Sequence, residues 1–335
     1  MIYHGRGIDM IRIGIVGYGN VGRGTESAVL QSEDMVLTGI FTRRAPESIH
    51  PLREDTPVYP ISRLEEPGAE VDVLLLCGGS ATDLPLQTPE LAHRYCVVDT
   101  FDTHARIPEH FTNVDAAAKE GGTTAIISTG WDPGLFSLMR ILGTSVLPEG
   151  TGDTFWGPGV SQGHSDAVRR IEGVADARQY TIPVQKTMQA VRKGESGFTA
   201  RDKHTREVYV VLKEGADPQR VAQEIITMPN YFDAYDTTVH FISADEMAAE
   251  HAAMPHGGFV IRSGRLGAAR QYDSLMEFKL ELDSNPMFTG AVMAAFGRAC
   301  HRLYAQGKRG CFTAFDVPLG LLSPLSAEEL RGKLL

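Results

Sequence analysis

The sequence predicts an α/β protein in which a doubly wound parallel sheet is joined to a second, α+β domain. Over residues 11–128, short apolar runs alternate with helix-like segments, which is typical of βαβ units and a parallel sheet. Beyond Gly130, glycine-rich turns separate β-branched segments of partly alternating polarity, which favour an antiparallel or mixed sheet. We therefore expect the architecture to change near residue 130.

The parallel part of the fold is predicted from the order of its elements. Ile11–Val16 is an apolar run typical of a buried strand, and Val71–Leu76 has nearly the same character. Further strands are expected over residues 36–41, 96–98 and 124–128, and helices over residues 20–31, 88–94 and 109–120.

The second half of the chain is predicted to be richer in strands. These are expected over residues 207–212, 237–242 and 271–282. Residues 289–306 carry small and apolar side chains at helical spacing, and we expect this helix to pack on the first domain. The first domain then comprises residues 10–130 and 283–335, and the second comprises residues 131–282.

Length and composition limit the class of protein. A chain of 335 residues can form two domains and bury a core without disulfides. The formal net charge of −10 argues against a nucleic-acid partner, because such proteins usually present a basic surface. No apolar run reaches the roughly 18 residues that span a bilayer, and residues 1–9 lack the apolar region of a secretory signal. We expect a cytoplasmic protein without a membrane partner.

The first nine residues, the cysteines and the histidines allow two further predictions. Met10 directly precedes the first strand, so residues 1–9 are expected to be an extension or to precede an alternative start. The four cysteines form no CxxC pair and the histidines form no HExxH motif, so we expect reduced cysteines and no metal site.

A GxGxxG motif follows the first strand and opens a helix, which is the context of a dinucleotide-binding Rossmann fold. The first glycine permits the tight turn, the second lets the backbone approach a pyrophosphate, and the third lets the helix pack on the strand. A glycine-rich turn without a ligand is the alternative. The residues that this motif predicts to bind the cofactor are Gly17, Tyr18, Gly19, Asn20, Val21 and Gly22.

The end of the second strand favours NADP over NAD. An NAD site places an acid there, on the ribose hydroxyl, whereas this chain has Thr42, Arg43 and Arg44. A hydroxyl and two guanidinium groups suit a 2′-phosphate, because arginine offers forked, charge-assisted donors. A solvated basic loop end is the alternative interpretation.

Four polar clusters lie at or after expected strand ends, over residues 78–83, 99–104, 128–134 and 155–166. Ligands of open α/β sheets bind outside the carboxyl ends of the strands. Taken singly, Asp102 and Asp132 could be helix caps or turn residues, and Trp131 and Trp156 could be core aromatics. The recurrence of acids at several strand ends favours a ligand site. The absence of a GxSxG motif disfavours a hydrolase.

With these motifs in order, the chain resembles the meso-diaminopimelate D-dehydrogenase family, and the resemblance extends from residue 11 to about residue 325. Thr42 stands where the family has a familiar Ser, and Phe101 where it has a Tyr. The segments that carry the resemblance are residues 17–22, 41–44, 79–83, 98–102, 128–134, 155–159, 161–166, 254–258 and 282–286.

The resemblance implies reversible oxidative deamination at the D-centre of meso-2,6-diaminopimelate, which gives L-2-amino-6-oxopimelate, ammonia and NADPH. It also implies a role in lysine and cell-wall metabolism and a homodimer. The further cofactor-binding residues that it implies are Ser80, Ala81, Thr82, Asp83, Leu84, Asp102, Thr103, His104, Pro133, Gly134, Leu135, Phe136 and Ser137. The implied substrate-binding residues are Asp102, Trp131, Asp132, Trp156, Gln162, Thr181, Arg206, His256 and Asn285.

This assignment makes chemical sense, because selectivity for one of two amino acid ends requires a clamp on the other end. Arg206, Thr181, His256 and Asn285 suit the distal carboxylate and ammonium. Asp102 and Asp132 are the candidate catalytic residues: one positions the reacting amine, and the other assists proton transfer or attack by water. Another NADP-dependent D-amino acid, homoserine-type or sugar dehydrogenase, or a non-catalytic NADPH-binding protein, are the alternatives.

Overall fold

The computed structural model describes residues 10–66, 68 and 70–335, so the expectation for residues 1–9 lies outside the described part. These residues divide into two compact units. Unit 1 comprises residues up to 138 together with residues 286–335, and unit 2 comprises residues 139–285. The first unit ends at residue 138, where the sequence predicted 130, and it resumes at residue 286, where the sequence predicted 283. Within the described residues, no helix combines the length and apolar character needed to cross a membrane.

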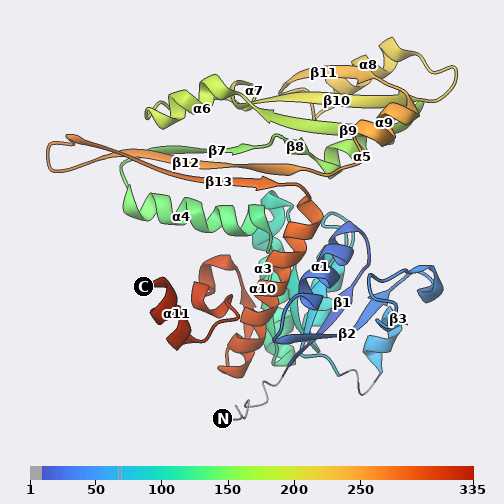
Figure 1. Ribbon diagram of the computed structural model, residues 1–335, viewed down its shortest axis with the longest axis vertical. Helices are drawn as coiled ribbons and strands as arrows, with labels where there is room; N and C mark the ends of the chain where they lie inside the picture. The colour runs from blue at the N-terminus through green and yellow to red at the C-terminus, as the bar shows by residue number, and fades with distance from the viewer. Residues whose placement is uncertain (1–9, 67, 69) are drawn as a thin grey trace, which may run out of the picture. The chain divides into compact units, whose positions relative to one another are not determined.

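Unit 1 contains a seven-stranded sheet in the order β14-β6-β5-β4-β1-β2-β3, in which every strand pair is parallel. Strands β1, β2 and β3 of this sheet are labelled in Figure 1. The first six strands along the chain follow the 3-2-1-4-5-6 order of a dinucleotide-binding fold, so the predicted doubly wound parallel sheet is confirmed. The strands are β1 (Ile11–Val16), β2 (Met35–Thr42), β3 (Val58–Pro60), β4 (Val73–Leu76), β5 (Cys96–Asp99), β6 (Thr124–Ile126) and β14 (Gly310–Phe312).

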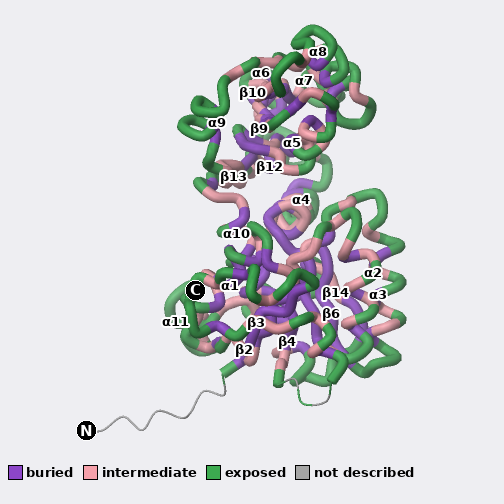
Figure 2. The backbone as a smooth tube through the Cα atoms, turned by 90° about the vertical axis from the view of Figure 1, so that its right-hand side faces the viewer, coloured by how far each residue is buried: buried purple, intermediate pink, exposed green. Residues whose placement is uncertain are grey.

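Helices cover both faces of this sheet, because successive strand side chains point to opposite faces. Ile13 and Leu75 face a core shared with Phe296 of α10 (Asn285–Ala305), whereas Leu74 and Leu76 belong to the opposite core. Helix α1 (Asn20–Leu30) contributes to the first core, and α2 (Leu84–Ala92) and α3 (Ile107–Gly121) contribute to the second. The central strands β4, β5 and β6 are buried, while the outer faces of α2 and α3 are exposed (Figure 2).

The expected return of the C-terminal helix to the first unit is confirmed. At the crossing of α1 and α10, a Cβ on Gly24 would lie 2.2 Å from the carbonyl oxygen of Pro286, and one on Gly290 would lie 2.2 Å from the carbonyl carbon of Gly24. Only glycine permits so close a backbone approach. These two glycines therefore allow α10 to lie directly against α1.

Unit 2 contains two sheets where the sequence predicted one. The four-stranded sheet has the order β11-β10-β9-β8 and is mixed, because β10 pairs parallel with β11 and antiparallel with β9; the three-stranded sheet, β13-β12-β7, is antiparallel. The strands are β7 (Thr151–Trp156), β8 (Gly159–Val160), β9 (Val174–Pro183), β10 (His204–Leu212), β11 (Asp236–Phe241), β12 (His256–Leu266) and β13 (Tyr272–Leu282).

The helices of unit 2 complete its two cores. Val168 of α5 and Val221 of α8 pack on Val208 of β10, and Met188 of α6 packs on Phe155 of β7. These helices are α5 (Gln162–Arg169), α6 (Gln185–Arg192), α7 (Ala200–Lys203), α8 (Pro218–Ile226) and α9 (Ala244–Glu250).

Two helix predictions were incomplete. Helix α2 begins at Leu84, four residues before the expected start, because Pro85 suits the first turn of a helix. Helix α4 (Phe136–Val146) was not expected, since it follows directly on the polar cluster that ends at Gly134. Its first residue, Phe136, is fully buried and meets Trp131 edge to face, with the ring centres 5.2 Å apart.

Candidate active site

The glycine loop of unit 1 has the geometry of a pyrophosphate-binding turn. Gly17 has a φ of +87°, which favours glycine, and its N–H donates to the Phe41 carbonyl at 2.9 Å. A Cβ on Gly22 would lie 2.4 Å from the Gly17 carbonyl oxygen, so only glycine fits at this position in the first turn of α1. Nothing lies within 4 Å of a Cβ built on Gly19, the N-cap of α1. The space beside Gly19, at the start of α1, is therefore open enough for a phosphate group to approach the backbone.

A buried carboxylate holds this loop to the segment after β2. Glu26 of α1 is fully buried and accepts hydrogen bonds from the hydroxyls of Tyr18 and, at 3.1 Å, Thr56, and from the N–H of Leu52 at 2.9 Å. Burial and the neighbouring Glu26 carboxylate raise the pKa of Tyr18. The phenol consequently remains a hydrogen-bond donor, and the loop is fixed before any ligand binds.

The two arginines after β2 lie beside this loop. The Arg44 guanidinium donates to the carbonyl of Tyr18, and the Arg44 N–H donates to the Thr42 hydroxyl at 3.1 Å. Arg43 forms an ion pair with Asp83 at 2.7 Å. The Arg43 side chain remains 65% exposed, so it can still reach a ligand phosphate.

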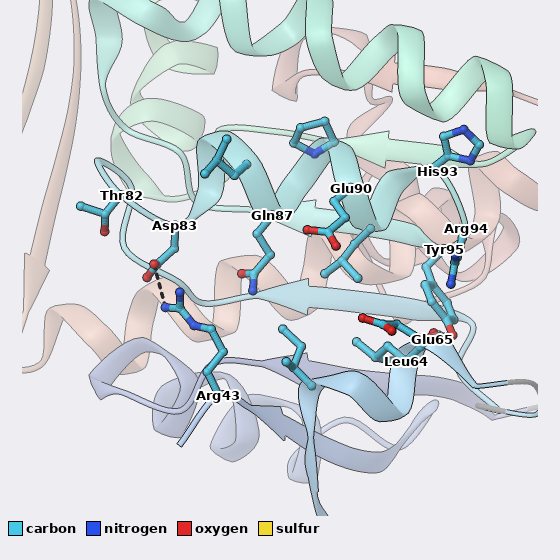
Figure 3. A pocket seen from close by; sticks show the side chains of 14 residues that line it. Arg43, Leu64, Glu65, Thr82, Asp83, Gln87, Glu90, His93, Arg94 and Tyr95 are labelled. Atoms are coloured by element: carbon cyan, nitrogen blue, oxygen red, sulfur yellow. Dashed lines mark hydrogen bonds and ion pairs between the residues drawn. The ribbon is translucent and has the colours of Figure 1, made fainter. Parts of the chain in front are cut away.

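Arg43 and Asp83 stand at one end of a groove of about 710 Å³ in unit 1 (Figure 3). The groove follows α2, and the side chains of Gln87 and Glu90 point into it, with Leu64 and Tyr95 along its length. Arg43 itself comes from the end of β2, so the groove begins at the carboxyl edge of the sheet. Its size and its mixture of apolar and polar side chains suit a planar ring system with polar edges.

The loops that follow β4, β5 and β6 meet at the same edge. The Asp102 N–H donates to the Ser80 hydroxyl at 2.8 Å, which joins the first and second polar clusters. The Thr129 N–H and hydroxyl both donate to the Asp99 carbonyl, at 2.9 and 2.8 Å, which joins the second and third clusters. Three clusters that are separated in sequence are therefore adjacent in unit 1. Asp102 is exposed there, and Asp132 is partly buried.

A fully buried carboxylate underlies these loops. Asp99 accepts hydrogen bonds from the Thr88 hydroxyl at 2.8 Å and from the N–H groups of Phe101 and Ser128 at 3.1 and 2.8 Å, and it contacts the His110 Nε2 at 2.7 Å. Phe101 in turn stacks on the His110 ring at 4.2 Å. One side chain thus fixes the segments that carry Asp102 and Trp131-Asp132.

In unit 2, the fourth polar cluster begins at Trp156. The Trp156 N–H donates to the His204 Nε2 at 2.9 Å, and the two rings stack with their centres 5.4 Å apart. Burial and the nearby Arg206 cation lower the pKa of His204 to about 3. The imidazole is therefore neutral, and its Nε2 is free to accept the backbone hydrogen bond that fixes the position of Trp156.

Thr181 and Arg206 face each other on neighbouring strands β9 and β10. The Arg206 guanidinium donates to the Thr181 hydroxyl, and both side chains are buried on the face of the sheet that α5 covers. Within the part of the chain that the structure describes, no carboxylate pairs with Arg206. A buried cation without an acid partner is costly unless an anion binds to it, so the arrangement is suited to an anionic group.

The remaining candidates of unit 2 are adjacent to this pair. A Cβ on Gly159, which pairs with Thr181, would lie 2.4 Å from the His256 backbone, so the two segments touch. The Gln162 amide donates to the Met254 sulfur at 3.6 Å, and the Asn285 N–H donates to the Met254 carbonyl at 3.0 Å. Burial lowers the pKa of His256 to about 4, so its ring is neutral at neutral pH.

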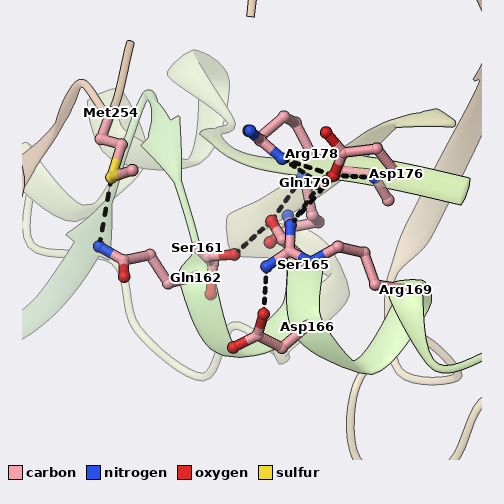
Figure 4. Close-up of polar contacts among 10 residues, drawn as sticks. Ser161, Gln162, Ser165, Asp166, Arg169, Asp176, Arg178, Gln179 and Met254 are labelled. Carbon is pink, nitrogen blue, oxygen red and sulfur yellow. Dashed lines mark hydrogen bonds and ion pairs between the residues drawn. The ribbon is translucent and has the colours of Figure 1, made fainter. Parts of the chain in front are cut away.

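The start of α5, which carries Gln162, is itself anchored to β9 (Figure 4). The Ser165 hydroxyl donates to the Ser161 carbonyl at 2.7 Å and accepts from the Gln179 N–H at 2.9 Å. The Ser161 N–H donates to the Gln179 carbonyl at 2.9 Å, and the Arg169 guanidinium donates to the Ala177 carbonyl at 2.8 Å. Unit 2 therefore holds six predicted substrate-binding residues on one rigid frame: Trp156, Gln162, Thr181, Arg206, His256 and Asn285.

Three supporting residues were not among the site residues predicted from the sequence. Tyr235 lies over the Arg206 guanidinium, His204 supports Trp156, and Met254 contacts Gln162 and Asn285. Met254 stands within a segment that carries the family resemblance. Tyr235 and His204 act through contacts between distant segments, and no motif marks them.

Comparison with known proteins identifies the family. Residues 130–284 match the model of the diaminopimelic acid dehydrogenase C-terminal domain. The meso-diaminopimelate D-dehydrogenase of Lysinibacillus sphaericus is 57% identical over 329 residues, which cover 98% of this chain and 100% of that protein. The chain belongs to the meso-diaminopimelate D-dehydrogenase family. The predicted family resemblance is therefore confirmed.

Solved structures of this family share the fold over nearly the whole chain. A sixfold variant of meso-DAPDH from Clostridium tetani E88 with DAP is 50% identical, covers 97% of this chain and 100% of its own, and has a TM-score of 0.91. The C. glutamicum DAP dehydrogenase in complex with DAP is 45% identical, and the match covers 98% of this chain and 100% of that chain with a TM-score of 0.90. An engineered D-amino acid dehydrogenase bound to NADP+ is 43% identical, and the match covers 97% of this chain and 100% of that chain with a TM-score of 0.86.

Proposed function

We propose that this protein catalyses the reversible, NADP-dependent oxidative deamination of meso-2,6-diaminopimelate at its D-centre. Substrate, NADP+ and water give L-2-amino-6-oxopimelate, ammonium, NADPH and a proton. The observation that carries the proposal is the buried Arg206, which has no acid partner among the described residues and adjoins five further polar or aromatic candidates. A fixed buried cation suits a substrate with a second carboxylate far from the reacting carbon.

A solved relative supports the assignment of the distal site. The variant of the Clostridium tetani protein is substituted at a Gln, a Thr, an Arg, a Pro, a His and an Asn, and it was solved with DAP. The same residue types occur here in the same order: Gln162, Thr181, Arg206, Pro255, His256 and Asn285. We propose that Arg206 and Thr181 bind the carboxylate of the L-centre, and that His256, Asn285 and Gln162 accept from or orient its ammonium group.

The residues of unit 1 fit NADP. The glycine loop and the start of α1 offer backbone N–H groups to a pyrophosphate, Arg43 and Arg44 offer guanidinium donors to a 2′-phosphate, and the groove beside Arg43 is large enough for adenine. When bound, NADP supplies the acceptor for the hydride that leaves the D-carbon. We assign the cofactor contacts proposed from the sequence to the loops that follow β1, β2, β4, β5 and β6.

Asp102 and Asp132 are proposed to act on the reacting amine. The D-ammonium must lose a proton before hydride can leave its carbon, and a water molecule must then add to the resulting imine. A carboxylate can accept each of these protons or orient the group that loses it. The Ser80 hydroxyl holds the Asp102 backbone, and the Asp99 network fixes the segment that leads to Asp132, so both acids are held in place before the substrate binds.

The proposal is tested by replacing each acid with the matching amide. Asp102→Asn and Asp132→Asn should each lower kcat for meso-diaminopimelate at least about tenfold, while NADPH binding, measured by fluorescence titration, stays within about twofold. If neither variant lowers kcat, the roles assigned to these carboxylates are wrong. If wild-type protein reduces no NADP with meso-diaminopimelate, the whole proposal fails.

A homodimer is proposed on the same grounds. Unit 2 leaves several large apolar side chains exposed, as a subunit interface would. These are Ile141, Leu142, Val146, Leu266, Tyr272 and Leu275. Sedimentation of the purified protein should give the mass of two chains. The expected cytoplasmic location stays a prediction.

A further inference from the structure

Arg206 lacks the partner that usually accompanies a buried arginine. The residue is only 7% exposed, its Nε has no hydrogen-bond partner, and no carboxylate among the described residues pairs with it. Its Nη1 donates a hydrogen bond to the Thr181 hydroxyl. This bond alone would not keep so long a side chain in one rotamer, so a further contact is needed.

Tyr235 supplies that contact. The Arg206 Cζ lies 4.0 Å from the centre of the Tyr235 ring, well within the distance of a cation–π interaction. The position of the ring is set by the backbone, because the Tyr235 N–H donates to the Phe232 carbonyl at 2.9 Å and Phe232 is fully buried. The next strand, β11, pairs with β10 so that Arg206 lies opposite Thr237, two residues beyond Tyr235.

The Arg206 guanidinium is the source of positive charge here, because the imidazole rings around it are neutral. Burial, followed by the charge of Arg206, lowers the pKa of His164 to about 4 and that of His204 to about 3. Burial also lowers the pKa of His256 to about 4. The three rings are therefore neutral at neutral pH, and the charge that attracts a carboxylate comes from Arg206.

We propose that Tyr235 is a positioning residue that determines specificity for the distal carboxylate of the substrate. The face of its ring stabilises the Arg206 guanidinium and fixes its plane, while the N–H edges of the guanidinium stay available to a carboxylate. An acidic residue at this position would also hold the arginine, but it would compete with the substrate for the same donors. This inference rests on the proposed function, which assigns Arg206 to that carboxylate.

The test compares two ligands that differ only in the distal carboxylate. D-Lysine is meso-diaminopimelate without the carboxylate of the L-centre. Tyr235→Leu should raise KM for meso-diaminopimelate about tenfold, as expected from the loss of a desolvated cation–π contact. The inhibition constant of D-lysine, measured in competition with meso-diaminopimelate, should stay within about twofold, because Arg206 has no carboxylate to bind in that ligand.

Two variants serve as matched controls. Tyr235→Phe keeps the ring but loses the hydroxyl, which also interacts with the Arg206 guanidinium, so KM for meso-diaminopimelate should rise less than in Tyr235→Leu, and the D-lysine constant should stay within about twofold of wild type. Tyr231→Leu removes a tyrosine of the same segment whose ring meets His164 rather than Arg206, and it should leave both constants unchanged. If Tyr235→Leu does not fold by circular dichroism, Tyr235→Met, which also lacks a ring, replaces it in the comparison.

The outcomes separate the two proposals. A rise in KM for meso-diaminopimelate with an unchanged D-lysine constant supports the assignment of Tyr235. An equal loss for both ligands shows a merely structural role, and no change for either shows that Arg206 is positioned without the ring; both results overturn the inference. If wild-type protein does not oxidise meso-diaminopimelate at all, the proposed function fails first.

Discussion

The buried carboxylate of Asp99 offers a sharp test of how the fold positions the proposed catalytic acids. Its four partners are the Thr88 hydroxyl, the N–H groups of Phe101 and Ser128, and the His110 ring. Removing the carboxylate with Asp99→Ala would leave four buried polar groups, at about 1–3 kcal/mol each. This loss approaches the whole free energy of unfolding of an ordinary domain, about 5–15 kcal/mol, so the alanine variant is a poor test.

Asp99→Asn is the informative change. The amide oxygen can keep both backbone N–H groups, and the amide nitrogen then faces the Thr88 hydroxyl, which can turn to accept, and His110, which must change tautomer. We expect the free energy of unfolding in urea to fall by about 1–2 kcal/mol, since one hydrogen bond is weakened. We also expect kcat for meso-diaminopimelate to fall at least tenfold, because small displacements of catalytic groups have large effects on rate, about 100-fold per ångström.

The control for this prediction is Asp55→Asn, which changes an exposed acid whose partner is Arg53. A surface pair of this kind should change the free energy of unfolding by less than about 1 kcal/mol and leave kcat unchanged. If Asp99→Asn unfolds at the same urea concentration as wild type and keeps the full kcat, the Asp99 network does not position the loops, and the reasoning is refuted.

Three further predictions follow from the geometry. Gly22→Ala would place a Cβ 2.4 Å from the Gly17 carbonyl, so NADPH binding by fluorescence should weaken at least about tenfold, whereas Gly332→Ala, in open space, should have no effect. Arg44→Ala should lower the preference for NADP over NAD by about tenfold to a hundredfold in kcat/KM, because a charge-assisted contact contributes about 1.5–3 kcal/mol; an unchanged preference would place the 2′-phosphate elsewhere. Because the pKa of His204 is about 3 in the folded protein but about 6.5 in the unfolded chain, the unfolded state binds more protons below pH 6.5. His204 should therefore lower the free energy of unfolding by about 1.4 kcal/mol for each pH unit between about 6.5 and 3. His204→Gln should flatten the slope of the whole protein by this amount; equal slopes for both proteins would contradict the assignment.

Much of unit 1 could be predicted from the sequence because its signals are local. An apolar strand followed by a GxGxxG motif has one common structural context, and Gly17 and Gly22 take the conformations that this context requires. The strand ends that precede Asp102 and Asp132 could also be predicted, because apolar runs alternate with helix-like segments in this part of the chain. That their loops touch follows from the parallel order of β4, β5 and β6.

The rest depends on pairing between distant segments, which a single sequence does not record. We predicted one sheet in unit 2, whereas the structure has two. Neither the β12–β13 hairpin nor the β9–β10 pair carries a turn motif from which the pairing of its two strands could be predicted. The same reason hid Tyr235, which contacts Arg206 only because β10 and β11 lie side by side. The burial of Asp99 was not predicted, because this residue belongs to a polar cluster that we assigned as a whole to a ligand site.

The proposed activity can be measured as the reduction of NADP, followed in the near ultraviolet, with meso-, L,L- and D,D-diaminopimelate as separate substrates and with NAD as the alternative cofactor. We expect turnover with the meso isomer and NADP, none with the L,L isomer, and little with NAD. Tight NADPH binding without turnover of the meso isomer would contradict the proposed function.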